Sequence, residues 1–273
     1  MPQILAPLIF AALIWWASTG ILLWLVRRGS LAHKTTISVL AACAILATIG
    51  ALVLRGDTSV TAAFLGFAGG ITIWAAHEAA FLFGFVTGSR KSPCPPDLPM
   101  RKRFVVSAQA VIHHELALAG HGLILIALSY GAPNQIMAST FALLWVMRLS
   151  TKLIIFLGAP NISVDMLPRQ LSYLGTYFNK RHITLWFPVI LTVITAIAGY
   201  LAYAGLAQPA GGFAYSGYLL LATLACLAVF EHMALVVPMP DRRLWAWALN
   251  DSTEKTTAPS VKQRQIMGGP DGL

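Results

Sequence analysis

Apolar residues fill seven long runs along this chain, and short polar segments separate the runs. A mostly apolar run of about 20 residues is long enough to cross the hydrocarbon core of a bilayer as an α-helix. The expected spans are residues 4–26, 36–54, 60–87, 104–129, 135–158, 183–206 and 212–237. The pattern predicts an all-α fold, a polytopic transmembrane helix bundle of about seven helices, with residues 1–249 as its transmembrane domain.

Two segments differ from these spans. Between the fifth and sixth spans, Leu167, Leu171, Leu174 and Phe178 recur at helical spacing with polar residues between them. This pattern predicts an amphipathic helix lying in the membrane interface. Residues 250–273 are polar and contain several glycines, so we expect a disordered cytoplasmic tail.

Composition supports a membrane protein and excludes an ordinary soluble domain. Hydrophobic residues make up 57% of the chain and charged residues 11%, whereas soluble domains carry roughly a quarter charged residues. The formal net charge of +9 would suggest a nucleic-acid partner in a soluble protein. Here the lipid bilayer is the expected partner, and no nucleic acid is expected.

The basic residues indicate the orientation of the bundle. All 19 lysines and arginines lie in alternate loops or after the last span, except Arg55, Arg148 and Lys152. Because basic residues are retained on the cytoplasmic side of short loops, the amino terminus is expected outside and the carboxyl terminus in the cytoplasm. Arg27 and Arg28 follow the first span, as expected of a helix that stays in the membrane. We therefore expect a multi-pass protein of a bacterial inner membrane, cytoplasmic or intracytoplasmic.

Ionisable residues inside the expected spans are the candidates for chemistry, because each is costly in a bilayer and needs a partner or a purpose. His77, His114 and Arg148 each lie about ten residues from the cytoplasmic end of their expected span, or roughly 15 Å deep. We expect a cofactor-binding set of His77, Glu78, His113, His114, Glu115, Arg148 and Lys152. Within this set, His77, Glu78 and His114 are the candidate metal ligands, and no catalytic residue is assigned.

Three interpretations of this cluster remain open. The side chains can tie helices together by hydrogen bonds, ligate a metal or cofactor, or carry protons. Several enzyme signatures are absent from the sequence: residue 81 is Phe, so His77 and Glu78 do not begin an HExxH motif, and there is no GxSxG elbow or P-loop. The three cysteines show no CxxC spacing, so a thiolate zinc site is not indicated.

Four stretches carry a resemblance to a known family. They are HEAAFLFGF at 77–85, IHHELAL at 112–118, WVMRLSTKLIIFLGAPN at 145–161 and LPRQLSYLGTYF at 167–178. These stretches resemble the PuhE family of photosynthetic complex assembly proteins in purple photosynthetic bacteria. The similarity runs from the third to the sixth span, is weaker before it, and has no counterpart in the tail.

The resemblance implies an inner-membrane accessory factor for photosynthetic complex assembly or bacteriochlorophyll production, and no known reaction. Its implied partners are reaction-centre or light-harvesting subunits and pigment enzymes. Neutral histidine suits the magnesium of a bacteriochlorophyll or its precursor, or a haem iron. A non-enzymatic factor is the leading expectation. The alternatives are an intramembrane metalloenzyme with iron or zinc on His and Glu ligands, and a proton-coupled transporter.

Overall fold

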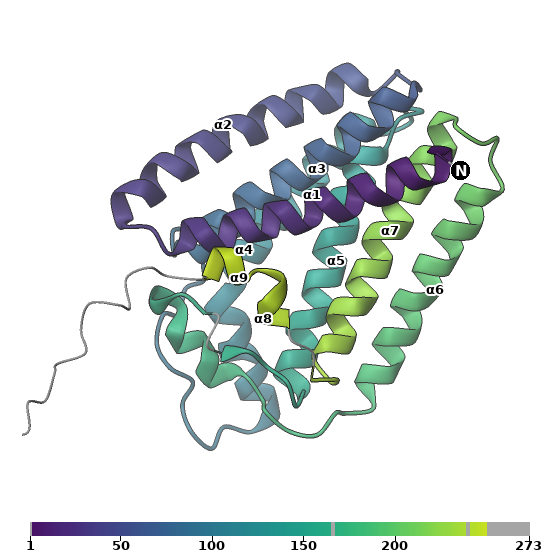
Figure 1. The fold of residues 1–273 in the computed structure, drawn as a ribbon. Coiled ribbons are helices and arrows are strands. Elements are labelled where there is room, and N and C mark those ends of the chain that lie inside the picture. The colour runs from purple at the N-terminus through teal and green to yellow at the C-terminus, as the bar shows by residue number, and fades with distance from the viewer. Residues whose placement is uncertain (1, 165–166, 239–240, 250–273) are drawn as a thin grey trace, which may run out of the picture.

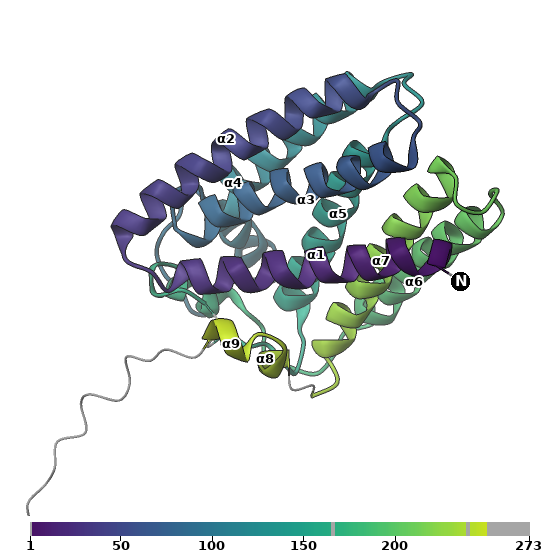
Figure 2. The same cartoon turned by 45° about the horizontal axis from the view of Figure 1, so that its top comes forward.

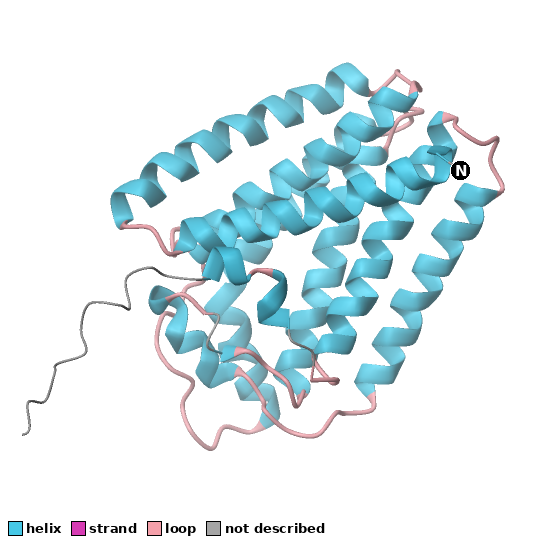
Figure 3. Ribbon diagram, viewed as in Figure 1, coloured by secondary structure: helices cyan, strands magenta, loops and turns pink. Residues whose placement is uncertain are grey.

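The computed structural model describes residues 2–164, 167–238 and 241–249, and this part of the chain is all-helical. Helix accounts for 76% of it, and no strand occurs in these ranges (Figure 3). Seven helices are long and apolar enough to span a membrane. They are α1 (Pro2–Val26), α2 (Ser30–Leu54), α3 (Val60–Leu82), α4 (Met100–Ser129), α5 (Ile136–Leu157), α6 (Trp186–Leu206) and α7 (Phe213–Ala234). The predicted seven-helix bundle is confirmed, while its orientation in the membrane stays a prediction.

Helices α3 and α7 form the centre of the bundle. About half of the apolar window of each is buried by protein, against 11% for α1 and α2. Helix α1 packs on both, α5 also contacts both, α2 lies along α3, and α6 lies along α7 (Figures 1 and 2). Small residues permit this close packing. A Cβ added to Gly70 of α3 would lie 2.8 Å from Cβ of Thr140 on α5.

Helix α3 ends at Leu82, so the expectation that it continues to residue 87 was wrong. Gly84 has φ +79°, the left-handed conformation that glycine adopts most readily. The amide groups of Phe85 and Val86 both donate to the carbonyl of Ala80. This glycine therefore terminates the helix by a left-handed C-terminal cap.

The chain after α3 folds back along α4. The amide of His114 donates to the carbonyl of Thr87 at 2.8 Å, and the amide of Arg90 donates to the carbonyl of Gln109 at 3.2 Å. Gly88 allows this approach, because a Cβ there would lie 2.1 Å from the carbonyl oxygen of Gln109. Hydrogen bonds with α4 thus satisfy non-helical backbone that lipid could not satisfy.

The segment between α5 and α6 contains a 3-10 helix, η2 (Arg169–Tyr177). Its apolar side chains Leu171, Leu174 and Tyr177 are buried in one cluster with Phe81 and Ala110. The predicted amphipathic pattern is present, but α3 and α4 cover its apolar face in place of lipid. A helix is thus confirmed within this segment, and its place at the membrane interface stays a prediction.

The last described residues dock on α1. Two short helices, α8 (Asp241–Leu244) and α9 (Ala246–Leu249), lie below the end of α1 in Figure 2. The indole of Trp16 donates to the carbonyl of Leu244 at 3.0 Å, and the indole of Trp245 donates to the carbonyl of Trp16 at 3.1 Å. The predicted tail, residues 250–273, lies outside the described residues.

Candidate functional site

The carboxylate of Glu78 on α3 joins α4 and α5. Its Oε1 atom lies 3.7 Å from Nε2 of His114, and its Oε2 atom lies 3.6 Å from Nη2 of Arg148. The side chain of Glu78 is only 6% exposed. The structure therefore brings together three of the seven residues expected to form the site, at one level of the bundle.

His114 is completely buried behind this carboxylate. Its ring lies 4.6 Å from the ring of Phe81, measured between centroids. Neither ring nitrogen has a hydrogen-bond partner within the described part of the chain, and Oε1 of Glu78 has none either. A separation of 3.7 Å is too long for a direct hydrogen bond. Because buried polar atoms are rarely left unpaired, a water molecule or a polar group of a ligand is the expected partner of these atoms.

Arg148 faces a large cavity. Its side chain is 42% exposed although it lies within the bundle. The cavity has a volume of about 400 Å³, and α1, α3, α5, α7 and the segments after α5 and α7 form its walls. This volume lies within the range of small-molecule sites, roughly 300 to 1,000 Å³.

The wall of this cavity is mainly apolar and aromatic, with three charged side chains. Trp15, Trp74 and Trp245 contribute indoles from three different segments. The charged residues are Glu78, Arg148 and Glu231, while His114 is not among the residues that line the wall. A ligand in the cavity would therefore meet carboxylates and a guanidinium before it met the histidine.

Glu231 of α7 is the member that sequence reasoning left outside the site. It lines the same cavity and interacts electrostatically with Arg148. The excess of intramembrane glutamates over basic residues was the available signal, since Glu78, Glu115 and Glu231 outnumber Arg148 and Lys152. Because Glu231 is far along the chain from the other charged residues, the sequence did not predict that it lies beside them.

Glu115 and Lys152 form a separate ion pair between α4 and α5. The Nζ atom of Lys152 lies 2.6 Å from Oε1 of Glu115. The indole of Trp145 donates to Oε2 of the same carboxylate at 3.1 Å. Both oxygens of Glu115 thus have partners within the protein. This pair serves as an interhelical tie beside the cavity.

His77 belongs to a third group, which connects α2, α3 and α4. The hydroxyl of Thr48 donates to the carbonyl of Ala44 at 2.7 Å, and Nε2 of His121 lies 3.0 Å from that hydroxyl oxygen. His121 therefore donates from Nε2, and its Nδ1 accepts from Nε2 of His77 at 3.0 Å. Neutral histidines with protons on Nε2 satisfy the whole chain, so these contacts have a structural explanation.

The remaining expected ligands are not brought to the cavity. His113 lies on the exposed side of α4. Among the described residues, no three His, Cys, Asp or Glu side chains are placed to hold one metal ion. The structure consequently does not gather the proposed metal set of His77, Glu78 and His114 around one point.

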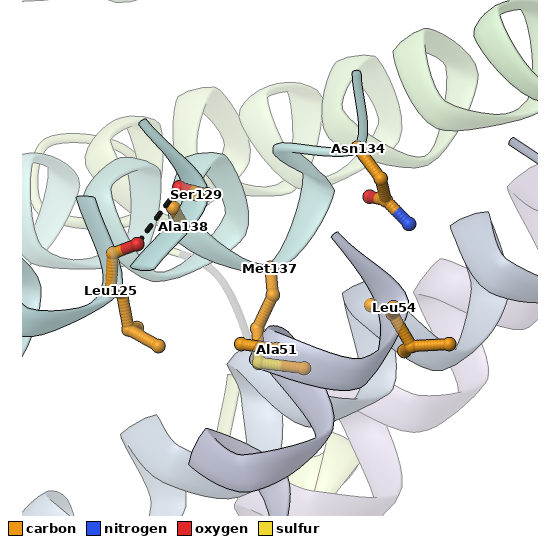
Figure 4. Close-up of a pocket in the computed structure, with 8 residues that line it drawn as sticks. Ala51, Leu54, Leu125, Ser129, Asn134, Met137 and Ala138 are labelled. Atoms are coloured by element: carbon orange, nitrogen blue, oxygen red, sulfur yellow. Dashed lines mark hydrogen bonds between the residues drawn. The ribbon is translucent and has the colours of Figure 1, made fainter. Parts of the chain in front are cut away.

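A second cavity lies at the opposite end of the bundle, where residues of α2 to α5 and the loop before α5 meet. Its volume is about 10 Å³, roughly the space of one water molecule. The hydroxyl of Ser129 in its wall donates to the carbonyl of Leu125 at 2.8 Å (Figure 4). This cavity is too small for an organic ligand, and the larger one is the candidate site.

Comparisons with known proteins identify a family and a full-length relative of this chain. The model of the family described as "Protein of unknown function (DUF3623)" matches residues 1–256. A protein of Rhodobacter capsulatus, described as "Uncharacterized 30.4 kDa protein in puhA 5'region", is 34% identical over 264 residues. The alignment covers 93% of this chain and 95% of that protein. No solved structure matches the chain significantly.

Proposed function

The chain belongs to the DUF3623 family, and we propose that it is an inner-membrane accessory factor for photosynthetic complex assembly or bacteriochlorophyll supply. In this proposal it holds a tetrapyrrole, or a precursor of one, in the cavity beside Glu78 and Arg148. The relative named for the puhA 5′ region, which belongs to photosynthesis genes, supports the biological setting. The membrane-embedded fold and the residues expected from the PuhE resemblance are consistent with it.

One observation carries the binding part of the proposal. A half-exposed arginine and a buried carboxylate share the wall of a cavity of about 400 Å³ inside a membrane bundle. Intramembrane charges are costly and usually mark a functional site. An apolar cavity with a few converging polar groups is the usual form of a small-molecule site.

The chemistry of the wall suits a flat, apolar ring system. Indoles pack well against such rings, and Trp15, Trp74 and Trp245 come from separate parts of the chain. Glu78 and Arg148 would orient the polar edge of the ring. His114 would act as a positioning residue, because it contacts the carboxylate and not the cavity.

No specific observation favours the two alternatives. A metalloenzyme needs several ligands around one ion, and the described residues offer no such group of three. A transporter of the broken-helix type needs interrupted spans, and each of the seven spanning helices is continuous between its described bounds.

The experiment is purification of the protein from a pigment-making host, with an absorption spectrum and a metal analysis of the same sample. We expect about one tetrapyrrole per polypeptide, and its loss from folded Arg148→Gln protein. Arg101→Gln is the matched control, since Arg101 is exposed at the start of α4. Well-folded wild-type protein without any tetrapyrrole would contradict the proposal.

A further inference from the structure

The charges on the cavity wall restrict the kind of tetrapyrrole that fits. The charged side chains that line it come from α3, α5 and α7, and α1 contributes Trp15, Ser18 and Thr19 without a charge. Two carboxylates, of Glu78 and Glu231, stand against the single guanidinium of Arg148. With all three groups ionised, the wall carries one net negative charge.

The two intramembrane cations already have carboxylate partners. Arg148 lies 3.6 Å from Glu78, and Lys152 lies 2.6 Å from Glu115. Lys152 does not line the cavity. A free carboxylate on a ligand would therefore compete with Glu78 for Arg148 while it approached Glu231. Two carboxylates held close together repel each other strongly in a medium of low dielectric constant, so the ligand carboxylate would lose binding free energy beside Glu231.

The aromatic side chains of the wall also disfavour an anionic ligand. The negative faces of indole rings attract a positive centre, and the cavity is lined by three of them. Trp15 and Trp245 meet edge to face with their centroids 5.6 Å apart. A ligand with an electron-accepting centre and no carboxylate matches this wall better than an anionic ligand does.

We propose that the cavity selects metal-loaded tetrapyrroles whose carboxylates are esterified and discriminates against the free acids, with Glu231 as the residue that sets this preference. The inference rests on the function proposed above. No lysine or arginine among the described residues lies at ion-pair distance from the carboxylate of Glu231, which Arg148 attracts at longer range and to which the indole of Trp15 donates. This carboxylate would face the metal-bearing ring, and it would repel the carboxylate of an unesterified precursor.

The test is a binding titration of purified protein in detergent with zinc protoporphyrin IX dimethyl ester and with zinc protoporphyrin IX, followed by porphyrin absorption and tryptophan quenching. We expect the free acid to bind weaker by about tenfold or more, the size of one like-charge contact at intermediate dielectric constant. The metal-free dimethyl ester, which lacks the positive centre, should also bind more weakly than its zinc form.

Variants of Glu231 assign the effect to this residue. Glu231→Gln keeps the shape and removes the charge, and it should reduce the difference between ester and acid. Glu231→Asp keeps the charge and should retain the difference. Tyr203→Phe, on the exposed side of α6, is the matched control, and protein-free micelles correct for partitioning.

The outcomes separate this inference from the proposed function. If the acid binds as tightly as the ester, or if Glu231→Gln leaves the preference unchanged, the charge selection is wrong while tetrapyrrole binding stands. If none of the porphyrins binds folded protein, the proposed function itself fails. Tighter binding of the zinc ester that depends on Glu231 supports both.

Discussion

Arg148 and Glu78 form an ion pair in which the arginine side chain is far more exposed than the glutamate side chain. The Nη2 atom of Arg148 lies 3.6 Å from Oε2 of Glu78, yet the arginine side chain is 42% exposed and the glutamate side chain 6%. The pair therefore connects the buried His114 on one side with the cavity on the other. A ligand that contacts Arg148 would act directly on the carboxylate that holds α3, α4 and α5 at this level.

We expect Arg148→Ala to lower thermal stability and accumulation, because it leaves Glu78 as a buried carboxylate without its cation. Breaking a buried pair costs roughly 3 to 5 kcal/mol, and partial exposure of Arg148 to the cavity places the effect at the lower end. Melting temperature in detergent and yield from membranes measure it.

Arg101→Ala is the appropriate control for this variant. Arg103 is unsuitable as a control, because its Nη2 atom donates to the carbonyl of Tyr177 at 2.8 Å and its guanidinium lies over the ring of Phe156. Arg101 is exposed. Equal melting temperatures for Arg148→Ala and Arg101→Ala would show that Glu78 does not depend on the guanidinium.

Gly88→Ala tests whether the chain after α3 folds back on α4. The added Cβ would lie 2.1 Å from the carbonyl oxygen of Gln109, so the loop must move and the hydrogen bond between Thr87 and His114 must lengthen. We expect a loss of about 1 to 3 kcal/mol, the usual cost of overpacking, measured as a lower unfolding midpoint.

Gly120→Ala on α4 supplies the control for this substitution. A Cβ at this position meets nothing within 4 Å, and alanine favours helix over glycine by about 1 kcal/mol. This variant should be as stable as the wild type or more so. Similar midpoints for the two variants would mean that residue 88 is not packed against α4.

Gly20→Ala tests the docking of the carboxyl-terminal segment on α1. A Cβ at Gly20 would lie 2.2 Å from the ring of Trp247. We expect the contact to open and amide hydrogen exchange of residues 243–248 to accelerate. Gly50→Ala on α2, where nothing lies within 4 Å, should leave this exchange unchanged. Unaltered exchange in Gly20→Ala would contradict the described docking.

The orientation of the bundle is open to a direct test. A reporter fused before Met1 should report the outside and one fused after Leu273 the cytoplasm, because the basic loops are retained inside. A periplasmic phosphatase fusion and a fluorescent protein fusion read the two sides. Finding both ends on the same side of the membrane would conflict with seven spans.

The sequence was sufficient to predict the number of spanning helices, because a long apolar run can cross a bilayer in few structures other than an α-helix. It also placed His77, the neighbour of Glu78, at the depth of His114 and Arg148, although α3 ends five residues after His77, at Leu82, and not ten. The two helices still meet at this level because α4 begins at Met100, earlier than expected, and extends past the end of α3.

The ion-pair partner of each intramembrane charged residue could not be predicted from the sequence. A small rotation of a helix decides whether Lys152 meets Glu78 or Glu115, and apolar runs without strong periodicity do not define that rotation. Glu115 was assigned to the cofactor set, but both its oxygens are held by Lys152 and Trp145. Glu231 was left out because the packing of α7 against α1 and α3 is a tertiary property.

We propose that a ligand occupies the cavity between α1, α3, α5 and α7, and a cavity-filling variant tests this proposal. Ala75 is buried and lines the cavity, so Ala75→Phe removes space without altering a charge. Ala42→Phe adds the same ring on the exposed side of α2. The measurement is tetrapyrrole per folded polypeptide after purification from a pigment-making host. We predict about one in the wild type and in Ala42→Phe, and close to none in Ala75→Phe; equal pigment content in both variants would contradict the assignment of this cavity.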